Sequence, residues 1–110
     1  MKLEVHERLS LMGILPKEGD YGALKTIRRA REMISFTPEE LTFYQLKTEI
    51  KDGKPSTSWN SQKAKEQIKD IPIDEYTTSV IRDKLADLNK RGKLTDETFS
   101  LYEKFVIAYK

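Results

Sequence analysis

The sequence predicts an α+β fold that is mostly helical, with about five helices and one two-stranded β-hairpin. Apolar residues recur at intervals of three and four along most of the chain, which is typical of amphipathic helices. Within residues 43–60 the apolar period changes to two, and Asp52-Gly53 is a strong signal for a two-residue hairpin turn. Asp, Asn, Ser or Thr stands at the expected start of most of the helices, where its side chain can cap the first turn.

The composition favours one domain over residues 1–110 and a mild preference for protein partners. There are 20 basic and 18 acidic side chains, so the formal net charge is only +2. Proteins dedicated to nucleic-acid binding usually carry a larger or more clustered basic excess. The chain has no Cys, which excludes disulfides, thiol catalysis, iron–sulfur clusters and thiolate zinc sites.

The first residues and the apolar runs predict a cytoplasmic protein. Charged side chains occur at Lys2, Glu4, Glu7 and Arg8, where a signal peptide needs its apolar run. No apolar run approaches the roughly 18–20 residues that span a bilayer. We therefore expect a cytoplasmic location and no membrane partner.

Two helices are predicted before residue 35. The first covers Leu3 to Met12, and Gly13 can end it. Its apolar positions recur at spacings of four and three: Val5, Leu9 and Met12. The second covers about Tyr21 to Ile34, with Asp20 as its cap. Its apolar stripe comprises Ala23, Leu24, Ile27, Ala30 and Ile34.

The second helix also carries a basic side. Lys25, Arg28 and Arg29 lie together on it, whereas Arg31 falls near the apolar stripe at about 100° per residue. Arg31 can therefore extend past the edge of the core, meet a carboxylate from another helix, or contact an anionic ligand.

A short helix and the hairpin follow. Thr37-Pro38-Glu39-Glu40 is a capping box with Pro at the first helical position. From Tyr44 the alternation predicts a half-buried strand. A turn at Asp52-Gly53 sets the predicted pairs Lys51–Lys54, Ile50–Pro55, Thr48–Thr57 and Leu46–Trp59. We expect Trp59 to dock this hairpin on the helices, because an isolated hairpin is marginally stable.

The remaining chain is predicted to be three helices. One starts at Asn60 or Ser61 and continues to about Asp70, with Ala64 and Ile68 facing inward. The next begins after Asp74, uses Thr77, Val80, Ile81, Leu85 and Leu88 for packing, and ends at Gly92. Thr95 caps the last helix, and the short connection between these two predicts an antiparallel pair.

The last helix is expected to bury a wide aromatic stripe. Its inward residues are predicted to be Phe99, Tyr102, Phe105, Val106 and Tyr109, with Leu101 and Ala108 at the flank. The stripe is wider than one neighbouring helix needs, so part of it could form a homo-oligomer or partner surface. The candidate protein-interface residues are Phe99, Tyr102, Phe105 and Tyr109.

No constellation of residues predicts an enzyme. His6 is the only histidine, and no second His or Cys exists to complete a common transition-metal site. The glycines form no phosphate-binding loop. We therefore predict no catalytic residues, no metal and no cofactor, and a function in protein binding.

The alternative function is binding of DNA or a nucleotide. The helix over residues 21–34 and the hairpin over residues 43–60 superficially resemble a winged-helix arrangement. The anion-binding candidates on that helix are Lys25, Arg28, Arg29 and Arg31. The lysines of the wing would be Lys47, Lys51 and Lys54. Glu18 and Glu32 dilute this basic patch, and the helix lacks side chains that often read base edges.

Short motifs spread over most of the chain carry a resemblance. They are Val5-His6-Glu7-Arg8-Leu9, Ile14-Leu15-Pro16-Lys17-Glu18-Gly19, Leu24-Lys25-Thr26-Ile27-Arg28, Ser35-Phe36-Thr37-Pro38-Glu39-Glu40, Trp59-Asn60 and Leu101-Tyr102-Glu103-Lys104-Phe105. Together they resemble a class of small uncharacterised proteins of tailed bacteriophages and prophages. The resemblance implies a phage origin and the host cytoplasm. It implies no activity and no site residues. From the balanced charge, the absence of catalytic residues and the wide aromatic stripe we expect a protein partner, which is a phage component, a second copy or a host protein.

Overall fold

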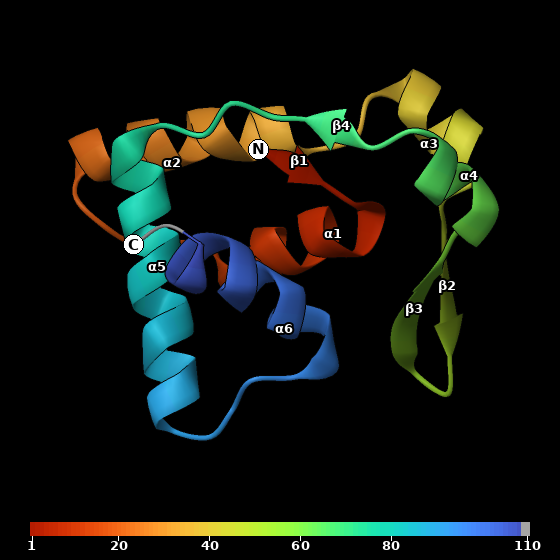
Figure 1. Cartoon of the computed structure of the whole chain (residues 1–110). Helices are drawn as coiled ribbons and strands as arrows, with labels where there is room; N and C mark the ends of the chain where they lie inside the picture. The colour runs from red at the N-terminus through yellow and green to blue at the C-terminus, as the bar shows by residue number, and fades with distance from the viewer. Residues whose placement is uncertain (109–110) are drawn as a thin grey trace.

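The computed structural model describes residues 1–108 and confirms a mostly helical α+β fold (Figure 1). Within these residues the α-helices are α1 (Val5–Ile14), α2 (Tyr21–Ile34), α3 (Pro38–Tyr44), α4 (Ser61–Glu66), α5 (Glu75–Lys90) and α6 (Asp96–Tyr102), which continues into a π-helical turn, η1 (Glu103–Ile107). Two antiparallel sheets have two strands each: β1 (Lys2–Leu3) with β4 (Lys69–Asp70), and β2 (Lys47–Lys51) with β3 (Lys54–Ser58).

The main core lies where α1, α2, α5 and α6 meet (Figure 1). Its buried side chains are Leu3, Leu11, Leu15, Ile27, Ile34, Ile71, Ile81, Leu85, Leu101 and Phe105. A second, smaller cluster of Val5, Tyr44 and Ala64 joins the start of α1 to α3 and α4. Trp59 packs against this second cluster, which confirms that it docks the hairpin on the helices.

The predicted caps set most of the helix boundaries. The Asp20 carboxylate accepts the Ala23 N–H at the start of α2, at 2.9 Å. The side chains of Thr37, Asp74 and Thr95 cap α3, α5 and α6 in the same way. Gly92, with φ of 65°, follows the end of α5 in the left-handed conformation that the sequence predicts there.

The predicted third long helix is wrong, because α4 ends at Glu66 and the chain then becomes extended. Strand β4 pairs with β1 at the other end of the sequence. The Met1 ammonium donates to the Asp70 carboxylate at 2.7 Å, and the Ile71 N–H donates to the Met1 carbonyl at 2.8 Å. Ile71 is buried in the main core, whereas Ile68, predicted to face inward, is exposed. Pairing between residues this distant overrides the local helical pattern.

The first helix also differs from its prediction. It begins at Val5, because Leu3 belongs to β1, and it continues through Gly13 to Ile14. Its buried apolar side chains are Val5, as predicted, and Leu11, while Leu9 and Met12 are only half-buried. The charged side chains of Glu7 and Arg8 are buried instead, in contacts described below.

The hairpin has the predicted pairing and turn but not the predicted burial. Pairs run from Lys51–Lys54 to Lys47–Ser58, and Asp52 and Gly53 both have positive φ. Every residue of β2 and β3 is exposed, and Ile50 is 78% exposed. Figure 1 shows the reason, since the hairpin extends away from the helices with no element covering it.

The predicted burial of the last helix is only partly correct. Leu101, placed at the flank, is fully buried, and so is Phe105, four residues further on. Phe99 is 59% exposed, and Tyr102 and Val106 are half-buried. The inward face of the last helix is therefore centred on Leu101 and Phe105, and the aromatic stripe divides between core and surface.

Candidate functional site

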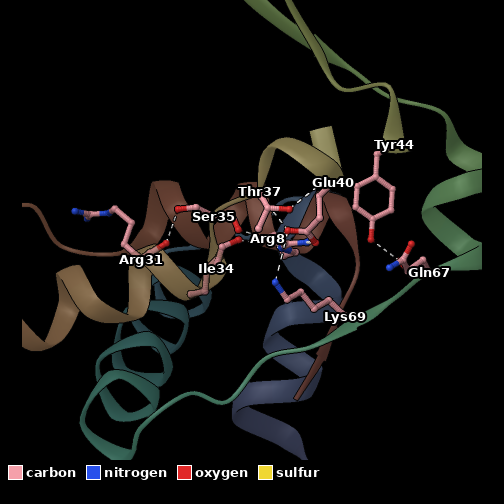
Figure 2. A network of polar contacts seen from close by, with 9 residues as sticks. All are labelled: Arg8, Arg31, Ile34, Ser35, Thr37, Glu40, Tyr44, Gln67 and Lys69. Atoms are coloured by element: carbon pink, nitrogen blue, oxygen red, sulfur yellow. Dashed lines mark hydrogen bonds and ion pairs between the residues drawn. The ribbon is translucent and has the colours of Figure 1, made fainter. Parts of the chain in front are cut away.

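A buried ionic network joins α1 to the segment between α2 and α3 (Figure 2). The Arg8 side chain is only 1% exposed, and its guanidinium donates to the Glu40 carboxylate through two nitrogens, at 2.7 and 3.0 Å. The same guanidinium donates to the carbonyls of Ile34 at 2.9 Å and Ser35 at 2.7 Å. Arg8 therefore donates hydrogen bonds both to carbonyls at the end of α2 and to a carboxylate in the first turn of α3.

Electrostatics around Glu40 explain why this charge pair is tolerated in the interior. Hydrogen bonds from Arg8 lower the pKa of Glu40 to about 2, with the Thr37 N–H adding to the effect and burial opposing it. The guanidinium also lies 4.0 Å from the centre of the Phe36 ring. Since these contacts satisfy both charged groups internally, we assign the network to the fold and not to a ligand site.

The pKa of Glu40 predicts a loss of stability in acid. Its folded-state pKa lies below its ordinary value of 4.5, so the stabilisation is complete above pH 4.5 and is lost as the pH falls toward 2. A shift of this size corresponds to about 3 kcal/mol in the free energy of unfolding. Urea unfolding of wild type and Glu40→Gln across this pH range measures it. If the free energy of unfolding depends on pH equally in the two proteins, the prediction is contradicted.

A second buried carboxylate lies at the start of α1. Burial raises the pKa of Glu7, but the Glu4 N–H at 2.9 Å and the Lys104 ammonium at 2.7 Å outweigh it and hold that pKa below its ordinary value. Ligand atoms of Glu4, His6 and Glu7 come within 4.8 Å of one another. The Glu7 carboxylate already binds Lys104, so this group is explained by the fold, and we draw no metal site from it.

One hollow of the surface is a cleft between α1, the hairpin and α6. Its volume is about 570 Å³. It is lined by His6, Leu9 and Ser10 of α1, Thr57 of β3, Trp59 directly after β3, and Asp96 and Glu97 of α6. Figure 1 shows how these elements lie, with α1 and α6 on the same side of the hairpin. We refer to this hollow as the α1–hairpin–α6 cleft.

The polar groups of this cleft are available to a ligand. The Ser10 hydroxyl, the Trp59 indole N–H and the Asp96 and Glu97 carboxylates make no hydrogen bond or ion pair within residues 1–108. Within residues 1–108, no Lys or Arg lines the cleft. The cleft thus combines an aromatic wall with two carboxylates, in contrast to the fully paired Arg8–Glu40 network.

The candidate interface residues of the last helix do not form one surface. Phe105 is fully buried and belongs to the main core. Tyr102 is half-buried and its hydroxyl accepts a hydrogen bond from the Asn89 amide at 3.2 Å. Phe99 is exposed, and Tyr109 lies outside the described residues. Only Phe99 among the described candidates retains the exposure that a contact surface requires.

The basic candidate residues of α2 also differ in their exposure. Lys25, Arg28 and Arg29 are exposed and make no ion pair in the described part of the chain. They line a hollow of about 400 Å³ together with Glu32 and with Tyr21, which is 81% exposed. Arg31 is half-buried and donates to the Pro16 carbonyl at 3.2 Å. It makes no ion pair within residues 1–108, and it lines a neighbouring hollow with Lys17 and Glu32.

The hairpin does not lie beside this basic surface. Figure 1 places the first turns of α2 and the hairpin at opposite sides of the molecule, with α1 between them. The winged-helix-like arrangement is therefore wrong, because Lys47, Lys51 and Lys54 cannot extend the basic surface of α2 as a wing would.

Comparison with protein-family models, curated proteins and solved structures finds no match for this chain. The resemblance to phage proteins accordingly stays a prediction. No helix within residues 1–108 is both long enough and apolar enough to cross a membrane.

Sequence reasoning missed the cleft, although it singled out some of its residues. It predicted that Trp59 docks the hairpin on the helices, but Asp96 and Glu97 were not among its candidate site residues. Nothing in the sequence around positions 6–10, 57–59 and 96–97 indicates that these three segments meet. Only the arrangement of α1, the hairpin and α6 around one hollow brings them together.

Proposed function

We propose that this chain is a non-enzymatic binding module that holds a segment of a partner protein in the α1–hairpin–α6 cleft. The observation that carries the proposal is the set of unpaired polar groups beside Trp59 in a cleft of about 570 Å³. That volume lies within the usual range for ligand sites. The resemblance to phage proteins supports a phage component, a second copy or a host protein as the source of the segment.

The exposed hairpin supports protein binding at this place. Residues paired across the two strands share a face, and the Thr48 and Thr57 hydroxyls lie 3.2 Å apart. Ile50 lies two residues beyond Thr48, so it shares that face. Since Thr57 lines the cleft, this face continues the cleft outward to an exposed isoleucine. A partner segment can therefore contact both the cleft and the apolar side of the hairpin.

The test is selection of binders from a library of random peptides on the wild-type protein. We expect enriched peptides whose affinity is lost in Thr57→Phe, which fills the cleft from β3. The matched control is Ser56→Phe, which adds the same ring to the neighbouring residue on the opposite face of the strand. Both positions are exposed, so both variants should fold. Peptides that bind wild type and both variants equally would contradict the proposal.

Binding of nucleic acid is the second candidate function, carried by the unpaired cations of α2. Lys25, Arg28 and Arg29 stand beside an exposed aromatic ring, Tyr21, on which a base can stack. If this surface contacts phosphates, affinity for single-stranded DNA falls as salt rises. Replacing all three cations by Gln should then reduce the dependence of log affinity on log salt by about 2, at roughly 0.7 per lost phosphate contact. Binding that shows no salt dependence would exclude this candidate.

A further inference from the structure

We propose that the segment held in the cleft is basic, with an Arg side chain, or less favourably a Lys, lying against Trp59 and bound by the Asp96 and Glu97 carboxylates. This inference rests on the proposed function, because it names the chemistry of the partner at the same site.

The charge of the cleft is the first argument. Asp96 and Glu97 are exposed, and neither has an ion-pair partner within residues 1–108. In the described part of the chain, the residues that line the cleft include these two carboxylates and no Lys or Arg. A cationic side chain entering from a partner would therefore meet unopposed negative charge, whereas an acidic segment would be repelled.

The capping of α6 shows that these two carboxylates are not needed for hydrogen bonding at the helix start. Thr95 is the N-cap, and its hydroxyl accepts the Thr98 N–H at 3.3 Å. The Thr98 hydroxyl in turn accepts the Thr95 N–H at 2.9 Å. Asp96 and Glu97 complement the helix dipole, but their oxygens remain free for an incoming donor.

Trp59 is the second argument, because the face of its indole is the best aromatic partner for a cation. The protein already places cations over two of its other aromatic rings: Arg8 over Phe36 at 4.0 Å, and Lys63 over Phe43 at 5.4 Å. No such contact involves Trp59 within the described residues. Trp59 is also held in place by the second core cluster, so the cation would not have to order its ring.

These groups distinguish Arg from Lys. A guanidinium can stack on an indole and at the same time donate in parallel to a carboxylate, whereas an ammonium is a compact and more strongly hydrated charge. The Trp59 N–H and the Ser10 hydroxyl can then bind the backbone of the same segment. We therefore expect Arg peptides to bind more tightly than Lys peptides of the same length.

The fluorescence of Trp59 tests this directly, since it is the only tryptophan of the chain. Blocked peptides of one length that carry Arg, Lys, Gln or Glu are titrated into the full-length protein. We expect a saturable change in emission with the Arg peptide, a weaker one with Lys, and none with Gln or Glu. Equal responses to the Arg, Gln and Glu peptides would overturn the inference.

Two pairs of variants test whether the Arg peptide binds in the cleft. Asp96→Asn/Glu97→Gln should weaken Arg-peptide binding by about tenfold or more, the loss of two charge-assisted contacts. The control Glu75→Gln/Asp83→Asn removes the same charge from α5 and should leave binding unchanged. Thr57→Arg, which supplies a cation to the cleft from within, should also weaken binding, and its control Ser56→Arg should not. If both members of either pair behave alike, the cleft is not the binding site.

The peptide selection described above separates failure of this inference from failure of the proposed function. Selected peptides that need an open cleft but contain no basic residue would overturn the inference and leave the function standing. If no peptide binds at all, both fail. Salt-sensitive self-association that is abolished both by Lys25→Gln/Arg28→Gln/Arg29→Gln and by Asp96→Asn/Glu97→Gln would support the inference and identify the segment as the basic helix of a second copy.

Discussion

Replacing Arg8 with Met should lower the free energy of unfolding by about 3–5 kcal/mol, which is the usual cost of removing one partner from a buried charge pair. The change leaves the Glu40 carboxylate without its main donor and leaves the carbonyls of Ile34 and Ser35 without theirs. Urea unfolding at neutral pH, followed by circular dichroism, measures the loss.

The matched control for this prediction is Arg28→Met, which removes an exposed guanidinium with no ion pair in the described chain. We expect a change within about 0.5 kcal/mol for this control. The double variant Arg8→Met/Glu40→Gln should recover part of the loss, because no uncompensated carboxylate remains. Similar stabilities for the Arg8 and Arg28 variants would show that the Arg8–Glu40 network does not hold the fold.

Replacing Phe105 with Ala should also destabilise the fold by about 3–5 kcal/mol. Phe105 is fully buried against the main core, so truncation removes its contacts and leaves a cavity between η1 and α5. Thermal and urea unfolding measure the loss.

Phe99→Ala is the control, since it makes the same substitution in the same helical segment at an exposed ring. We expect a change of less than about 1 kcal/mol, because little area leaves water at that position. The two residues share the predicted aromatic stripe, so this pair of variants tests which part of the stripe belongs to the core. Equal losses would mean that Phe99 is buried in solution, for example in a homo-oligomer, which sizing by light scattering would reveal.

The largest differences between prediction and structure concern side-chain burial, and Arg8 illustrates the reason. On a helical projection Arg8 is one charged residue among several, and such residues are almost never fully buried unless they are paired. Its partners are a carboxylate 32 residues away and the carbonyls at the end of another helix. Nothing near Arg8 in the sequence indicates those partners.

The hairpin shows the same division between local and distant effects. Alternation correctly predicted the pairing of β2 with β3, because the geometry of a two-residue turn sets the register. Alternation also predicted a buried face, and that was wrong. A period of two shows which residues share a face, but only the position of the helices decides whether that face is covered.

By itself the sequence determined the fold class, the capped starts of α2, α3, α5 and α6, and the register of the hairpin. These features depend on interactions between residues a few positions apart, which a linear pattern records. Tertiary structure alone decided the pairing of β1 with β4, the burial of Arg8, the exposure of Phe99, and the cleft that gathers Trp59, Asp96 and Glu97. Each of these depends on contacts between distant segments, whose positions follow from how the whole core packs.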